Sequence, residues 1–85
     1  MAAQVQYYAI VTVSRSMRAA AGLARRTFAP EGPFDETLRR DMSWHPDSVI
    51  VEWEYGDVGA ELVRVSEDEA DRLTGSFQAR WRESA

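Results

Sequence analysis

The sequence predicts a small α+β domain, in which an antiparallel sheet of three to four strands packs one face against a C-terminal helix in the order β-(β)-α-β-β-α. Three observations predict it: a period-two apolar pattern near the N-terminus, a glycine-containing connection between two β-branched segments, and a capped amphipathic helix near the C-terminus. The chain has 85 residues, enough for one hydrophobic core, so residues 1–85 are expected to form a single domain.

Residues 4–14 are expected to form a strand, because β-branched and aromatic residues dominate and apolar positions recur every second residue. The wholly apolar face consists of Val5, Tyr7, Ala9, Val11 and Val13. Tyr8 and Ile10 make the other face partly apolar, which indicates partial cover there or a partner.

Residues 16–28 permit two interpretations. Their alanine-rich stretch favours a helix, but Gly22 in its middle lowers helix stability by about 1 kcal/mol relative to alanine. A turn over residues 15–20 and a second strand over 22–28 is favoured, since Thr27 and Phe28 prefer strands and the apolar spacing is not helical. Residues 29–33 have the composition of a loop.

Residues 33–42 are expected to form a short helix. Pro33 suits the first helical turn, and Phe34, Leu38 and Met42 recur at the i, i+4, i+8 spacing of one helix face. Residues 43–47 then form a break, because Pro46 disfavours helical backbone at the residue before it.

Residues 48–65 are expected to form a β-hairpin. Val49, Val51 and Trp53 share one face of the first strand, and Ile50, Glu52 and Glu54 share the other. Residues 55–59 contain two glycines for a tight connection, and residues 60–65 supply the return strand.

The C-terminal segment from Ser66 carries the clearest helix pattern. Ser66 and Glu69 have the spacing of a capping box, in which each side chain bonds the backbone amide of the other residue. The apolar stripe that follows is Ala70, Leu73, Phe77 and Trp81. This helix would cover one sheet face, and no element is available to cover the opposite face.

Composition excludes several classes of protein. The chain has no cysteine, which excludes disulfides, thiol catalysis and thiolate metal sites. No apolar run is long enough to span a bilayer, and the N-terminus lacks the pattern of a signal peptide, so we expect no membrane contact and a cytoplasmic protein. All ten basic residues are arginine, which is typical of a bacterium with a GC-rich genome.

Catalytic signals are weak. His45 is the sole histidine, and with Asp41 and Asp47 it matches no familiar metal-ligand spacing. No serine stands in a nucleophile motif and no phosphate-binding loop is present. We therefore predict no catalytic, metal or cofactor site, and a small enzyme that uses His45 with a nearby carboxylate is the third hypothesis.

The net charge of −4 conceals a polarity along the chain. Residues 1–40 hold six arginines against three acidic residues, a net +3, whereas residues 41–85 hold four against eleven, a net −7. Candidate contacts to an anion or partner are Arg15, Arg18, Arg25 and Arg26. A nucleic-acid-associated protein is thus the second hypothesis, although the acidic total disfavours it and pairing of Arg25 and Arg26 with Glu52, Glu54 or Glu61 explains them better.

Nine aromatic residues are many for one sheet with one covering helix. Exposed apolar and aromatic patches mark interfaces, and the candidate interface residues are Tyr8, Ile10, Trp53, Tyr55 and Trp81. The leading hypothesis is a non-catalytic protein-interaction module that forms a homodimer, through the uncovered sheet face or an edge strand, or binds another protein.

Overall fold

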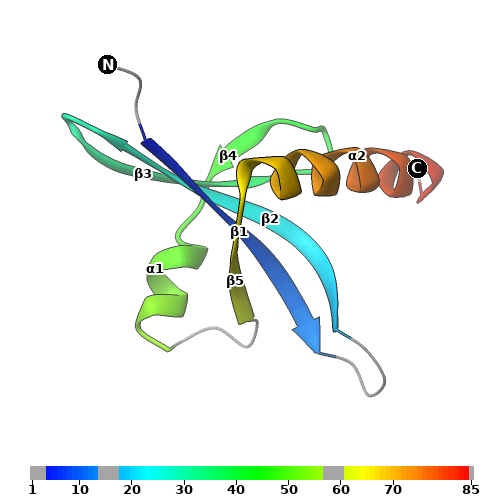
Figure 1. Ribbon diagram of the computed structural model, residues 1–85, viewed down its shortest axis with the longest axis horizontal. Helices are drawn as coiled ribbons and strands as arrows, with labels where there is room; N and C mark the ends of the chain where they lie inside the picture. Colours follow the sequence, from blue (N-terminus) through cyan, green and yellow to red (C-terminus); the bar gives the residue numbers. More distant parts are fainter. Residues whose placement is uncertain (1–3, 14–17, 57–60, 85) are drawn as a thin grey trace.

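The computed structural model describes residues 4–13, 18–56 and 61–84, which form a five-stranded antiparallel sheet with a helix on each face (Figure 1). The elements are β1 (Gln4–Val13), β2 (Arg18–Ala29), β3 (Gly32–Leu38), β4 (Trp44–Pro46), α1 (Val49–Glu54), β5 (Glu61–Val65) and α2 (Glu67–Ser84). Their order across the sheet is β4-β3-β2-β1-β5. The predicted α+β class, with an antiparallel sheet and a C-terminal helix, is confirmed.

The long antiparallel pair of β1 and β2 forms the centre of the sheet. Tyr7 lies opposite Arg25, and Ala9 lies opposite Leu23. The strand predicted over residues 22–28 is confirmed as part of β2. The predicted turn over 15–20 is wrong at residues 18–20, because β2 already begins at Arg18, and its residues 15–17 lie outside the described residues. The register shifts beside Gly22, where an added Cβ would lie only 3.3 Å from Ile10 Cδ1.

The helix predicted over residues 33–42 is wrong, because residues 32–38 form β3. Its pairing with β2 places Glu36 opposite Arg25 and Asp35 opposite Arg26, and both opposite-charge pairs are formed. Such cross-strand pairs stabilise a sheet, and they join β3 to β2 through partners that lie nine and eleven residues away in the sequence. Residues 44–46, expected in a break, form the short strand β4.

The strand predicted over residues 49–54 is also wrong, because this segment forms α1. The Asp47 carboxylate accepts a hydrogen bond from the Val49 amide at 2.8 Å, which satisfies a free donor at the helix start. Ile50 is 0% exposed and packs with Ala24 and Leu62. The return strand, β5, does form, but it pairs with β1, so the predicted hairpin is absent.

The C-terminal helix is confirmed. The Glu69 amide donates to Ser66 Oγ at 3.1 Å, while the Glu69 carboxylate pairs with Arg72 at 2.9 Å. The predicted stripe packs on the sheet, with Ala70 and Phe77 buried against Leu23 and Leu38.

Each sheet face has its own apolar cluster. The α2 side holds Leu23, and the α1 side holds Ala24, since successive residues of a strand point to opposite faces. The expectation that one face lacks cover is wrong, because the chain leaves β4 at one edge and crosses that face through α1 before it reaches β5 at the other edge (Figure 1).

Candidate functional site

The outer edge of β3 is covered along only part of its length. β4 pairs with Glu36, Thr37 and Leu38. One further bond, from the Asp47 amide to the Asp35 carbonyl at 3.1 Å, follows before the chain turns away into α1. Within the described part of the chain, no strand lies beside residues 32–34, so this half of the edge is open.

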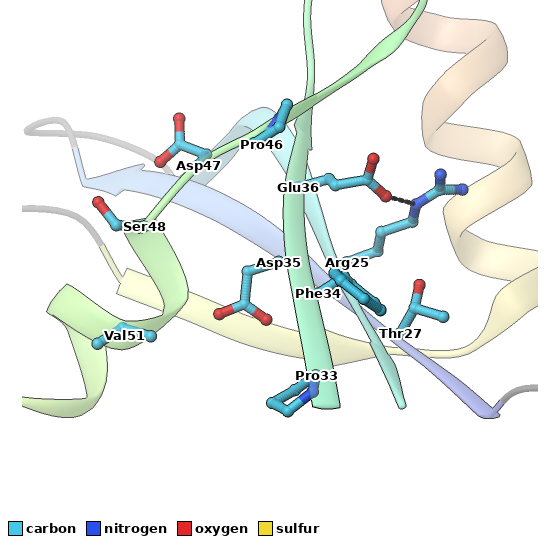
Figure 2. Close-up of a pocket in the computed structure, with 10 residues that line it drawn as sticks. All are labelled: Arg25, Thr27, Pro33, Phe34, Asp35, Glu36, Pro46, Asp47, Ser48 and Val51. Atoms are coloured by element: carbon cyan, nitrogen blue, oxygen red, sulfur yellow. Dashed lines mark hydrogen bonds and ion pairs between the residues drawn. The ribbon is translucent and has the colours of Figure 1, made fainter. Parts of the chain in front are cut away.

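A groove of about 820 Å³ runs along this open edge and is open to solvent (Figure 2). Residues of β2, β3, β4 and α1 and the segment between β4 and α1 line it: Arg25, Thr27, Pro33, Phe34, Asp35, Glu36, Pro46, Asp47, Ser48 and Val51. The open edge and this groove therefore form one surface feature.

The lining divides into two walls, one on each side of β3, as Figure 2 shows. The first wall is on the α2 side and consists of Arg25, Thr27, Phe34, Glu36 and Pro46. The second wall is on the α1 side and consists of Pro33, Asp35, Asp47, Ser48 and Val51. Strand alternation produces this division, since Phe34 and Asp35 are neighbours in sequence but point to opposite faces.

The first wall combines an internal ion pair with two apolar side chains. Phe34 is 51% exposed, a large fraction for a phenylalanine in a strand. Arg25 Nε donates to Glu36 Oε1 at 2.9 Å, and the Arg25 guanidinium lies 4.1 Å from the centre of the Trp44 ring. The two charges of this wall thus neutralise each other, and Phe34 and Pro46 remain as its apolar contacts.

The second wall carries two carboxylates and no basic side chain of its own. Asp47 Oδ2 accepts bonds from Thr37 Oγ1 at 3.2 Å and from Arg39 Nη2 at 3.0 Å. Asp35 is held by Arg26, which is outside the lining. Val51 of α1, 39% exposed, and Pro33 are the apolar residues of this wall.

Arg26 fixes the position of the second wall. Its Nε and Nη2 donate to the two Asp35 oxygens at 2.7 and 2.9 Å, and its Nη1 and Nη2 donate to the Glu54 carboxylate at 3.2 and 3.0 Å. Hydrogen bonds to these two carboxylates, Asp35 first, raise the pKa of Arg26. One guanidinium therefore joins β2, β3 and the end of α1.

The four arginines predicted to contact an anion or partner do not form a patch in the described residues. Arg25 pairs with Glu36, and Arg26 pairs with Asp35 and Glu54. Of these partners, Glu54 is the one that the sequence predicts. Arg15 and the side chain of Arg18 lie outside the described part of the structure.

The five predicted interface residues lie in three different places. Tyr8, Ile10 and Trp53 are half-buried in the cluster on the α1 side. Trp81 stacks on Phe77 at 5.0 Å on the α2 side, and Tyr55, at the end of α1, is 78% exposed. Their role in an interface stays a prediction.

His45 lies in an exposed cluster with Asp41 and Ser43 at the β3–β4 turn. Ser43 Oγ and Asp41 Oδ2 contact the same histidine nitrogen, Nε2, at 2.8 and 3.0 Å. A hydrolytic triad requires the serine and the carboxylate on different ring nitrogens, so this geometry does not match one. Hydrogen bonds from the Ser43 hydroxyl and amide, and then from His45, lower the pKa of Asp41 to about 2. The cluster closes a turn in which Met42 has φ 63.

No protein-family model, curated protein or solved structure matches this chain, so the groove is interpreted from its own geometry. In the described residues, neither helix is long and apolar enough to cross a membrane. No group of three histidine, cysteine, aspartate or glutamate side chains that could hold a metal ion occurs in that part of the chain either.

The sequence does not predict the groove, because its local patterns place Phe34 in a helix stripe, Pro46 in a break and Val51 on a strand face. One signal was present in the sequence. A proline within a sheet is confined to edge strands, strand starts or bulges, and Pro33 and Pro46 both lie in strands of this edge.

Proposed function

We propose that this protein is a non-catalytic interaction module that binds an extended segment of another protein in the groove along β3. The observation that carries the proposal is the half-exposed Phe34 beside the open half of the β3 edge. Exposed aromatic side chains in a hollow are frequent centres of protein interfaces, and addition of a strand to a sheet edge is a common mode of peptide recognition.

The shape of the groove favours a chain segment over a small molecule. Small-molecule sites bury most of the ligand surface, whereas this groove is open to solvent and has walls on both sides of the sheet edge. The charges of Arg25 and Arg26 are engaged within the fold, which removes support for phosphate binding through these two residues.

The sequence favours self-association partly because it predicts an uncovered sheet face, and α1 covers that face. The proposal therefore assigns the groove to a different protein, in the cytoplasm that the sequence predicts. A homodimer formed through the same groove is an outcome that the test distinguishes.

The test is selection of a phage-displayed random peptide library on the immobilised protein, followed by affinity measurement with the recovered peptides. We expect Phe34→Ser to weaken binding by at least about tenfold, the effect of losing an interface anchor. The matched control is Val63→Ser, because Val63 is an exposed apolar strand residue, 37% exposed, on β5 outside the groove.

Three outcomes contradict the proposal. The first is a selection with no enrichment over an uncoated surface, and the second is a recovered peptide that binds the Phe34→Ser variant as well as the unchanged protein. The third is a dimer, seen by analytical ultracentrifugation, that Phe34→Ser dissociates and Val63→Ser does not, because a second copy would then occupy the groove. Circular dichroism of both variants checks that the fold is retained.

A further inference from the structure

The position of the two walls restricts the conformation of the bound segment. Phe34 and Val51 lie on opposite sides of the sheet edge, so a side chain that contacts one cannot reach the other from the same direction. A β-strand directs successive side chains to opposite faces, whereas a helix presents neighbouring positions on one side. An extended segment beside β3 therefore reaches both walls at once.

The path of β4 shows where this strand fits. β4 lies antiparallel beside Glu36–Leu38 of β3, and its last backbone bond joins Asp47 to Asp35 before the chain departs. The position beside residues 32–34, where no strand lies among the residues that the structure describes, continues the line of β4. Pro33 has no amide proton to donate, so the backbone edge supplies few hydrogen bonds and the side chains must provide most of the selectivity.

The two walls differ in the side chains that they favour. The first wall pairs its own charges and exposes Phe34 and Pro46, which favours an apolar side chain. The second wall carries Asp35 and Asp47, and Glu54 shares the Arg26 guanidinium with Asp35. Only two guanidiniums, those of Arg26 and Arg39, bond these three carboxylates in the contacts described above, so this side retains negative charge and favours a basic side chain.

We infer that the segment bound under the proposed function is a strand, in line with β4, whose apolar side chains face Phe34 and whose basic side chains alternate with them and face Asp35, Asp47 and Val51. The partner is thus recognised by alternating apolar and basic residues in an extended stretch of its chain. This inference rests on the proposed function and adds the chemistry and spacing of the segment.

The experiment measures fluorescence anisotropy with three labelled peptides that share Gly-Ser ends. The first alternates valine and lysine, the second has the same composition with the valines and lysines in separate blocks, and the third replaces the lysines by glutamate. We expect the alternating valine–lysine peptide to bind at least about tenfold more tightly than either of the others, and more weakly as salt is raised.

A charge change on the second wall makes the test specific. Val51→Arg should weaken binding of the alternating valine–lysine peptide by at least about fivefold and strengthen binding of the glutamate peptide, because a cation then replaces an apolar contact among carboxylates. Val63→Arg is the matched control, since Val63 has nearly the same exposed fraction on β5, and it should change neither affinity.

The failure of the inference differs from that of the proposed function. The inference is overturned if library peptides bind in a Phe34-dependent way but the alternating and block peptides bind equally, or if Val51→Arg leaves the preference for lysine over glutamate unchanged. Both ideas fail together if no peptide binding depends on Phe34.

Discussion

Arg26 on β2 and Asp35 on β3 lie directly opposite each other, with two guanidinium nitrogens donating to the two carboxylate oxygens at 2.7 and 2.9 Å. This bidentate pair fixes the register of the strand that carries the groove. The same guanidinium bonds Glu54 and so holds the end of α1 against the edge of the sheet. The packing of the second wall therefore depends on a residue that does not line it.

Replacing Arg26 by lysine should lower the free energy of unfolding by about 1–3 kcal/mol. A single ammonium group cannot reproduce the two bidentate contacts, and the side chains of Arg26 and Asp35 are both mostly buried. Urea unfolding followed by circular dichroism measures the change. Arg39→Lys, at an exposed pair with Asp47, is the control and should cost no more than about 0.5 kcal/mol. Equal effects at the two positions would show that Arg26 has no special structural role.

Ile50→Ala should lower the free energy of unfolding by about 2–5 kcal/mol, because it leaves a cavity between α1 and the sheet where Ile50 is fully buried. The adjacent Val51→Ala, at an exposed position of the same helix, should change it by less than about 1 kcal/mol. Denaturant titration of both variants checks the difference. Similar values would contradict α1 as the cover of this face and would favour the strand that the sequence predicts.

Ser66→Ala should destabilise the protein by about 0.5–2 kcal/mol through loss of the bond from the Glu69 amide. Ser76→Ala, on the exposed surface of the same helix, should be neutral or slightly stabilising, because alanine has the higher helix propensity by up to about 0.5 kcal/mol. The thermal midpoint should therefore fall in Ser66→Ala and stay unchanged or rise slightly in Ser76→Ala. An unchanged thermal midpoint for Ser66→Ala would show that the bond from the Glu69 amide to Ser66 does not stabilise the helix.

The pKa of Asp41 is lowered from 3.8 to about 2 by its bonds from Ser43 and His45. Because the folded state then favours the charged carboxylate, this group stabilises the fold above about pH 4, and its contribution is lost as the pH falls towards 2. The difference in thermal midpoint between the unchanged protein and Asp41→Asn should accordingly narrow across that interval. A difference that stays constant from pH 5 to 2, on scans at matched ionic strength, would contradict a role for the charged form.

The parts of the fold that the sequence predicts are those with strong local patterns. β1 alternates over its whole length, and α2 has both a cap and an apolar stripe, so periodicity alone identifies them. Residues 33–42 satisfy a helical stripe through Phe34, Leu38 and Met42, yet the partners of Asp35 and Glu36 lie on β2. Local spacing contains no information about those cross-strand partners.

Residues 49–54 show the opposite error. Their β-branched residues alternate as in a strand, but a helix places Val49, Ile50 and Trp53 against the second apolar cluster. Burial of apolar side chains against that sheet face stabilises the helix more than the weak local preference stabilises a strand. The groove could not be predicted either. Phe34 and Val51 line the same sheet edge only because residues 32–38 form a strand and residues 49–54 form a helix, and the sequence pattern indicates the reverse for both segments.

The most direct test of the proposed function is an NMR titration of the isotope-labelled protein with a peptide recovered from the library. The account predicts that amide shifts concentrate at Phe34, Asp35 and Val51, with little change at Val63 or along α2. Shifts concentrated on β5 or α2, or shifts that persist at full size in the Phe34→Ser variant, would contradict binding at the open edge of β3.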